Sequence, residues 1–335
     1  MDDVGGSSEV STIPAYSGSL LRTDSYVITV GIGTPKKDFT VMFDTGSDLS
    51  WILCTTCIEC EAPEKLLFDA IYRIIDLQQH PVQLGSRRKG NLIRDTLTLT
   101  PSAVLPNFVF GCSDGDIGGD LTTGLIGLGR GKASLFSQAS EKFGKIFSYC
   151  LPSSPNSMGY LAIGRTGLPP HVMYTPMLTT PTWPSLYFVG LAAIKVADKT
   201  LPLPPTVYSR TVIDSGTVIT RLPPMAYSTL RSEFRKYMTD YTPVPPMFDL
   251  DACDDVSRHE NLKVPTVELL FDDGASLTLD FDGTMIMKDD YKACLAFAVN
   301  NDTGINIIGN NQQKKYTVVY DVANAKIGVG AGGCD

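Results

Sequence analysis

Short apolar runs, broken by glycine, proline or aspartate, dominate the chain and predict a β-rich fold. Within them hydrophobic residues alternate with polar ones or follow one another without a break, and β-branched and aromatic residues are frequent, as in strands. The predicted strands span residues 26–32, 38–43, 95–99, 107–111, 186–196, 275–281, 292–299 and 316–322. Helical spacing is clear in residues 225–238 and 134–143. The pattern therefore predicts a large, mainly β protein with a few short helices.

A coarse internal repeat organises these strands. In the first half, VMFDTGS is followed later by GLIGLG; in the second half, TVIDSGT is followed by INIIGN. Each half thus offers an aspartate at the end of an apolar run, a turn of small and hydroxyl residues, and a later apolar segment ending in glycine. Two related lobes facing each other across a pseudo-twofold axis would bring Asp44 and Asp214 together. We predict an N-terminal lobe of residues 1–165 and a C-terminal lobe of residues 166–335.

Composition and charge exclude several classes of protein. The 335 residues are 43% hydrophobic, which is enough for two real cores. The net charge of −8 and the isoelectric point near 5.0 argue against nucleic acid or an anionic membrane as the main partner, because both require a basic face. No apolar run approaches the roughly 20 residues of a membrane helix. The polar N-terminus lacks the apolar core of a signal peptide, so an exported form would already have lost its targeting segment.

Eight cysteines, an even number spread along the chain, favour a disulfide framework over a metal cluster. The local run Cys54, Cys57 and Cys60 has the C-x2-C-x2-C spacing of some zinc and iron-sulfur sites. No fourth ligand follows closely, and the three histidines are scattered, so we predict no metal. With Cys112, the first lobe holds four cysteines, which allow three pairings. Asn301 begins a glycosylation sequon, which is consistent with a secretory route.

Several ordered motifs together resemble one known family. They are Gly33-Thr34-Pro35, Asp44-Thr45-Gly46-Ser47 with Trp51, the Cys54 to Cys60 run, Phe110-Gly111-Cys112, Gly127 to Gly131, Phe147 to Cys150, Asp214-Ser215-Gly216-Thr217, and Ile308-Gly309-Asn310. Over nearly its whole length the chain is similar to pepsin-like aspartic peptidases, specifically the plant nepenthesin-type branch. The resemblance implies two β-rich lobes with a cleft between them and cleavage of peptide bonds in acid. We expect a secreted monomer, with the vacuole as an alternative location, that takes protein or peptide substrates and needs no cofactor.

The paired motif suits the chemistry that the resemblance implies. Two carboxylates about 3 Å apart cannot both ionise cheaply, so Asp44 and Asp214 would share one proton in acid, as the catalytic pair of aspartic proteases does. The charged member takes a proton from a bound water, and the neutral member polarises the scissile carbonyl. By resemblance, the residues that support this dyad are Thr45, Gly46 and Ser47 in the first lobe and Ser215, Gly216 and Thr217 in the second.

The first lobe departs from the family pattern where a hairpin should cover the cleft. The family has a cysteine-bearing insertion here, followed by a flap with a substrate-covering tyrosine. When Gly85 and Ser86 are aligned with the flap, Val82 stands where that tyrosine belongs, and the insertion is truncated. Trp51 is a cleft candidate, and a buried indole N–H usually needs a hydrogen-bond partner. Without the flap tyrosine, Trp51 would lose such a partner. We therefore expect an intact dyad whose activity is weakened by an altered flap.

Disulfide pairing also follows from the resemblance. It suggests bridges between Cys150 and Cys334, Cys253 and Cys294, Cys54 and Cys57, and Cys60 and Cys112.

Two other functions remain as alternatives at this level. Gly111 to Gly115 has the G-x-S-x-G form of a nucleophile elbow, but a loop-like sequence follows it where a serine hydrolase needs a helix. The second alternative is a catalytically weak or inactive homologue that binds another protein, as plant xylanase-inhibitor proteins of this fold do. The preferred function is an aspartic endopeptidase.

Overall fold

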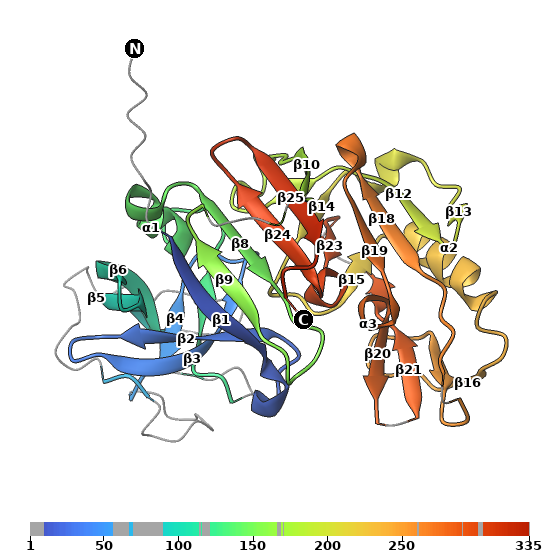
Figure 1. The fold of residues 1–335 in the computed structure, drawn as a ribbon, viewed down its shortest axis with the longest axis horizontal. Helices are drawn as coiled ribbons and strands as arrows, with labels where there is room; N and C mark the ends of the chain where they lie inside the picture. Colours follow the sequence, from blue (N-terminus) through green and yellow to red (C-terminus); the bar gives the residue numbers. More distant parts are fainter. Residues whose placement is uncertain are drawn as a thin grey trace, which may run out of the picture.

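The structure consists almost entirely of β-sheet, and its two halves share one long sheet (Figure 1). A computed structural model describes residues 10–55, 67–69, 90–113, 115, 121–165, 169, 171–259, 261–289, 291–300 and 304–334. The predicted mainly β architecture with few short helices is confirmed. No helix in these ranges is long and apolar enough to span a membrane.

The shared sheet has twelve strands and runs in the order β10-β25-β24-β8-β9-β1-β2-β3-β7-β4-β6-β5. Strands β24 and β25, from the end of the chain, lie beside β8 and β9 in the middle of the molecule (Figure 1). The strands are β1 (Ser11–Ser17), β2 (Tyr26–Ile32), β3 (Lys37–Asp44), β4 (Trp51–Leu53), β5 (Gly90–Thr100), β6 (Ala103–Ser113), β7 (Gly124–Gly127), β8 (Ile146–Cys150), β9 (Gly159–Ile163), β10 (Met173–Pro176), β24 (Tyr316–Asp321) and β25 (Lys326–Ala331).

Three smaller sheets build most of the second half. The five-stranded one carries the second aspartate motif, and the two four-stranded ones lie further from the first half (Figure 1). The five-stranded sheet contains β11 (Phe188–Val189), β14 (Thr211–Ile213), β15 (Thr220–Leu222), β22 (Phe297–Val299) and β23 (Asn306–Ile308). The four-stranded sheets contain β12 (Leu191–Val196), β13 (Lys199–Thr200), β18 (Val267–Phe271) and β19 (Ser276–Leu279), and β16 (Thr242–Val244), β17 (Cys253–Asp255), β20 (Met285–Lys288) and β21 (Lys292–Leu295).

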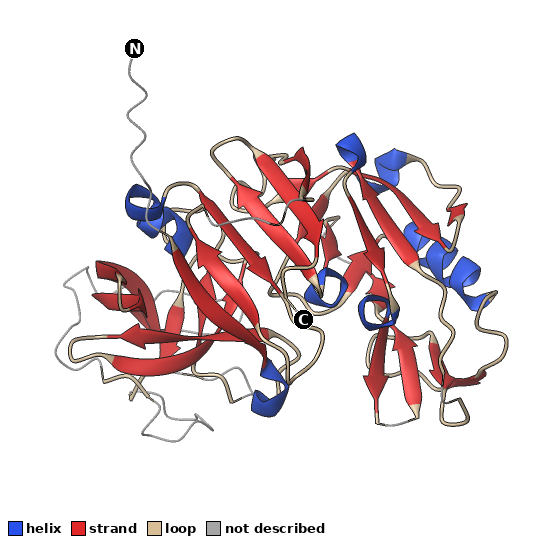
Figure 2. Ribbon diagram, viewed as in Figure 1, coloured by secondary structure: helices blue, strands red, loops and turns tan. Residues whose placement is uncertain are grey.

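The described helices are short and lie around the sheets (Figure 2). Helix α1 begins after Ser134, whose hydroxyl caps it by accepting the Ser137 amide at 3.1 Å, and α2 buries Leu230 and Phe234. Both lie where the sequence predicts helices. The α-helices are α1 (Leu135–Phe143), α2 (Pro224–Arg235) and α3 (Phe281–Thr284); the 3-10 turns are η1 (Gly18–Leu21), η3 (Pro205–Tyr208), η4 (Asp272–Gly274) and η5 (Asn310–Gln313).

Two of the predicted strands are wrong as single elements. The run 186–196 divides at Gly190 into β11 and β12, and the run 292–299 divides at Ala296 into β21 and β22, with the parts in different sheets. At the first break a Cβ on Gly190 would lie 1.8 Å from Asp272 Oδ2, so any other residue would displace the Asp272 side chain. At the second, the Ala296 amide leaves its ladder to donate to Thr284 O at 2.8 Å. Continuous hydrophobicity indicates burial at both places but not the change of sheet.

The disulfides correct part of the predicted pairing. Cys150 is bonded to Cys334 and Cys253 to Cys294, as the resemblance implies. Cys54 is bonded to Cys112, so the Cys54–Cys57 and Cys60–Cys112 pairs are wrong. Strand β4 runs parallel to β6, with Ile52 opposite Cys112, and this register brings the Cys54 and Cys112 Cα atoms to 5.6 Å. The bridge also excludes Cys54 as a metal ligand. Cys57 and Cys60 lie outside the described residues.

Candidate active site

The two aspartate motifs meet at the centre of the molecule, each at the end of a buried strand. Asp44 ends β3, which runs parallel to β7 with Asp44 opposite Gly127. Asp214 follows β14, which runs parallel to β23 with Ile213 opposite Ile308. In both halves the aspartate strand therefore pairs with the later apolar segment of the repeat. The symmetry predicted from the sequence is present in the strand pairing.

Reciprocal hydrogen bonds lock the two motifs together beneath the carboxylates. The Thr45 amide donates to Ser215 Oγ at 3.1 Å, and the Ser215 amide donates to Thr45 Oγ1 at 3.0 Å. Each hydroxyl then donates to the opposite strand, Thr45 Oγ1 to Ile213 O at 3.3 Å and Ser215 Oγ to Phe43 O at 3.1 Å. Thr45 and Ser215 are both 1% exposed, so these bonds form away from water. They fix the relative position of the two aspartates.

The glycine of each motif makes room for the aspartate of the other. A Cβ on Gly46 would lie 2.9 Å from both carboxylate oxygens of Asp214. A Cβ on Gly216 would lie 2.2 Å from Asp44 Oδ1. Contacts this short are incompatible with any side chain unless the carboxylate moves. Each carboxylate therefore lies against the backbone of the opposing motif, which brings the two acids close together.

Backbone and hydroxyl donors orient the carboxylates. The Gly46 amide donates to Asp44 Oδ1 at 2.7 Å, and the Gly216 amide donates to Asp214 Oδ1 at 2.9 Å. The Thr217 hydroxyl donates to Asp214 Oδ2 at 2.6 Å. Its counterpart Ser47 lies close enough to lower the pKa of Asp44, but its buried Oγ makes no hydrogen bond of normal geometry within the described ranges. The two halves of the site are therefore not equivalent, and Asp214 has the additional donor.

Electrostatics separates the two acids further. Burial, and then the negative charge of Asp214, raise the pKa of Asp44 well above the ordinary carboxyl range. The Gly216 amide and the Thr217 hydroxyl both donate to the Asp214 carboxylate and hold it in place. Because the acids are coupled, any titration that is observed belongs to the pair. In acid the pair is expected to share one proton, and the raised pKa of Asp44 favours Asp44 as its holder.

We expect the folded protein to lose stability as the pH rises from about 4 to about 8. The raised pKa of Asp44 means that the folded protein keeps a proton that the unfolded chain releases above its ordinary value of about 3.9. This stabilisation is complete below about pH 4 and is lost as the pH passes through the folded-state value of about 8. Thermal melts across the range should show a steeper fall for the wild type than for Asp44→Asn. Parallel profiles for the two proteins would contradict this.

Buried groups to which the sequence analysis gave no role in the site support its floor. The four residues of η5, Asn310 to Gln313, all carry side-chain amides, and all are buried, between 0% and 2% exposed. Asn310 Nδ2 donates to Ser215 O at 3.1 Å, and Gln313 Nε2 donates to Asp214 O at 3.0 Å. Tyr149 donates to Gln313 Oε1, and its hydroxyl lies 3.1 Å from that of Tyr320. The available signal was the run Asn-Asn-Gln-Gln directly after Ile-Ile-Gly, because polar side chains that follow a core strand need hydrogen-bond partners if they are buried.

The first apolar-glycine segment continues into a loop that surrounds Asp48. A Cβ on Gly129 or Gly131 would lie 2.3 or 2.2 Å from an Asp48 carboxylate oxygen, and the Gly131 amide donates to Asp48 Oδ1 at 2.7 Å. Ser185, from the second half, donates to Asp48 Oδ2 at 2.6 Å. The loop thus holds a carboxylate and links the two halves.

The remaining predicted site residues have different outcomes. Trp51 is 4% exposed and packs with Leu53 and Leu67 in the first half. Ser113 of the candidate nucleophile elbow is fully buried at the end of β6 and donates to Gly115 O at 2.8 Å, so it is not presented to a cleft. The flap candidates Val82, Gly85 and Ser86 and the sequon residue Asn301 lie outside the described residues.

Comparison with known proteins agrees with this geometry. Residues 26–73 and 75–165 match the family model "Xylanase inhibitor N-terminal", and residues 186–330 match "Xylanase inhibitor C-terminal". An aspartyl protease family protein of Arabidopsis thaliana is 37% identical over 98% of this chain and 76% of its own length, and aspartic proteinase nepenthesin-2 of Nepenthes gracilis is 29% identical over 94% of this chain and 78% of its own. The chain belongs to the plant aspartyl protease family, in its xylanase-inhibitor and nepenthesin-like branch.

Solved structures match the fold over nearly the whole chain. Basic 7S globulin from soybean superimposes with a TM-score of 0.76 at 18% identity, covering 97% of both chains. The crystal structure named edgp gives a TM-score of 0.74 at 19% identity and covers 98% of this chain and 96% of its own. At these identities the likeness establishes the fold and carries no argument about activity.

Proposed function

We propose that this protein is an aspartic endopeptidase that hydrolyses peptide bonds at acidic pH through Asp44 and Asp214. The observation that carries the proposal is the fixed geometry of the two carboxylates. Each lies against the glycine of the opposing motif, and the buried exchange of hydrogen bonds between Thr45 and Ser215 prevents them from separating. Membership of the aspartyl protease family supports the same function.

The geometry gives each aspartate a distinct part in the reaction. A water held between the carboxylates loses a proton to the charged Asp214 as its oxygen attacks the scissile carbonyl carbon. The neutral Asp44 donates to the carbonyl oxygen and stabilises the tetrahedral intermediate as negative charge develops there. The intermediate breaks down when its nitrogen takes a proton from the dyad and leaves as the amine. No bond forms between enzyme and substrate, so no nucleophilic side chain is needed.

A second candidate function is protein binding without efficient cleavage. The family models that match both halves are described as xylanase inhibitor domains, which favours this candidate. The sequence places a valine, Val82, at the position of the flap tyrosine, and a weakened flap would lower activity by about 10²-fold without disturbing the dyad. The dyad geometry favours the enzyme over this candidate.

The working compartment follows from the same chemistry. The proposed chemistry belongs to a class of peptidases that works in acid, and three disulfides among the described residues require an oxidising route. We propose a secreted protein acting in an acidic extracellular space, with the vacuole as the alternative.

Cleavage of an unfolded protein between about pH 2 and pH 7 tests the enzyme. We expect activity in acid and complete inhibition by pepstatin, which mimics the tetrahedral intermediate. The control is the same protein with a serine-protease inhibitor, which should have no effect. If folded protein cleaves nothing at any pH while pepstatin still binds, the dyad is formed but unproductive, and the protein-binding candidate is preferred.

A further inference from the structure

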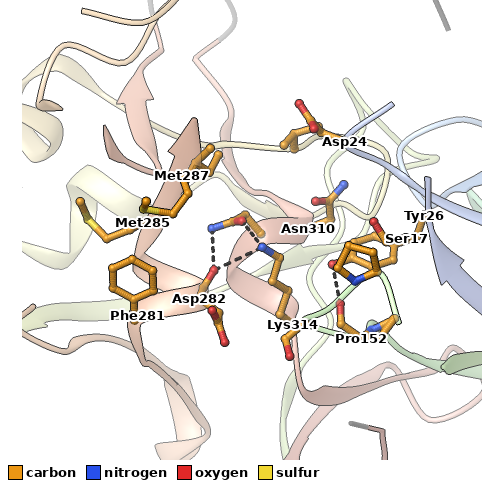
Figure 3. Close-up of a pocket in the computed structure, with 15 residues that line it drawn as sticks. Ser17, Asp24, Tyr26, Pro152, Phe281, Asp282, Met285, Met287, Asn310 and Lys314 are labelled. Carbon is orange, nitrogen blue, oxygen red and sulfur yellow. Dashed lines mark hydrogen bonds between the residues drawn. The ribbon is translucent and has the colours of Figure 1, made fainter. Parts of the chain in front are cut away.

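A cavity of about 390 Å³ lies between the two halves, and its wall includes Asn310, whose side chain donates to Ser215 O of the second aspartate motif at 3.1 Å (Figure 3). Ser17 and Tyr26 line it from the first half, and Met285 and Lys314 line it from the second. Its wall also includes Val218, the residue after the Thr217 that donates to Asp214. The volume falls within the range of small-ligand sites, about 300 to 1,000 Å³. The cavity is therefore a candidate site for one side chain of a bound peptide.

Lys314 brings a positive charge into the cavity without a carboxylate in contact. Its Nζ donates to Asn311 Oδ1 at 2.6 Å and to the backbone oxygen of Asp282 at 3.3 Å, and both bonds are visible in Figure 3. An ammonium group has three donors, and no third acceptor lies within reach among the residues that the structure describes. Burial lowers the pKa of Lys314, although nearby carboxylates oppose the shift. The charge is thus partly desolvated and incompletely paired, which favours an added acceptor.

The carboxylates near the cavity do not supply that acceptor. Asp282 Oδ2 accepts from Lys315 at 2.5 Å, and Lys315 also donates to Asp280 at 2.7 Å, so these charges are already paired. Asp24 lines the cavity as well and its charge acts on Lys314, but it is exposed and forms no ion pair with Lys314 among the described residues. Figure 3 shows Asp24 on the opposite side of the cavity from Lys314. The cation therefore dominates the inner part of the cavity and Asp24 its rim.

We propose that Lys314 makes this cavity selective for substrate side chains that end in an acceptor oxygen, glutamate or glutamine, over lysine and arginine. The inference rests on the proposed peptidase function and names its substrate class. The methylene groups of such a side chain pack against Met285 and Met287, which supply an apolar wall, while the terminal oxygen accepts the third Lys314 donor. A substrate lysine would bring a second cation to the same place.

Peptides that differ at one position test the proposal. Sets carrying glutamate, glutamine, leucine or lysine at each position in turn are assayed at about pH 5, where a glutamate with the ordinary pKa of about 4.3 is ionised. At one position we expect kcat/KM for glutamate to exceed that for lysine by about tenfold or more, mostly through KM. Lys314→Met should reduce this ratio to about one, and Lys314→Arg should preserve it. Thermal melts establish that both variants are folded.

Asp24→Asn is the matched control, because it removes a charge from the same cavity. It should raise the glutamate-to-lysine ratio or leave it unchanged. The proposal is overturned if lysine is preferred and Asp24→Asn abolishes that preference, if no position distinguishes the peptides, or if the ratio survives Lys314→Met.

Binding of the same peptides to Asp214→Asn, followed by fluorescence anisotropy, separates this inference from the proposed function. If glutamate peptides bind more tightly and this depends on Lys314, while the wild-type protein cleaves nothing, the selectivity of the cavity is supported and the peptidase function is rejected. Pepstatin-sensitive cleavage with no preference would support the peptidase and reject the cavity.

Discussion

Asp44→Asn and Asp214→Asn should each abolish acid-dependent cleavage, with at least about a 10³-fold loss of kcat/KM. The amide cannot take a proton from water at position 214, and at position 44 it cannot release one to the carbonyl oxygen. Both variants should fold, because the Thr45 and Ser215 hydrogen bonds that join the halves do not involve the carboxylates. The measurement is the initial rate on an unfolded protein or a quenched fluorescent peptide, with circular dichroism to establish the fold.

The matched control is Asp38→Asn, which removes a carboxylate from the same strand. The Asp38 side chain is 58% exposed, and within the part of the chain that the structure describes its ion-pair partner is Lys36. An ion pair at the surface contributes little to stability. The Asp38→Asn variant should retain wild-type activity. A dyad variant that kept more than about one-tenth of the wild-type rate would show that the cleavage does not depend on the carboxylate pair.

Gly216→Ala should lower kcat by about 10²-fold while leaving the fold intact. The added methyl group would lie 2.2 Å from Asp44 Oδ1, so the carboxylate has to move away from its partner. Neither Gly216 nor Gly46 has a positive φ, so alanine strains neither backbone and the clash with the opposing carboxylate is the main effect. We expect kcat to fall more than KM, because the displaced group acts in the transition state.

Gly46→Ala is the natural comparison, because it makes the equivalent change in the other half. Its methyl group would lie 2.9 Å from the Asp214 oxygens, a milder contact, so the loss should be smaller than for Gly216→Ala. Steady-state kinetics, with pepstatin affinity as a second readout, distinguish the two. If both variants kept the wild-type rate, the carboxylates would not be held against these glycines during catalysis.

The sequence predicted the main elements because their signals are local. Alternation and β-branched residues placed part of the strands, but not β1, β8, β9 or β25 of the central sheet. Helical spacing placed α1 and α2, and the duplicated Asp-Thr/Ser-Gly turn marked both aspartates. The breaks at Gly190 and Ala296 leave no such signal, because a strand that changes sheets remains hydrophobic throughout. Hydrophobicity indicates burial and cannot indicate which neighbour a strand has.

Contacts between distant segments depend on the tertiary structure. The pairing of Cys54 with Cys112 follows from the parallel register of β4 and β6, whereas four cysteines in a sequence leave three choices. Gln313, Tyr149 and Tyr320 support the floor of the site only because η5, β8 and β24 converge there. No local pattern contains that convergence, because their positions depend on the whole sheet.

By itself, then, the sequence determined that two aspartate motifs are present, that they are related, and that small and hydroxyl residues accompany them. The tertiary structure decided how the motifs differ. Thr217 donates to Asp214 while Ser47 lacks the equivalent bond to Asp44 among the described residues, and burial raises the pKa of Asp44. Residue type limits which hydrogen bonds a side chain is able to make, but distance, burial and the position of neighbouring charges determine which bonds form and which acid keeps the proton.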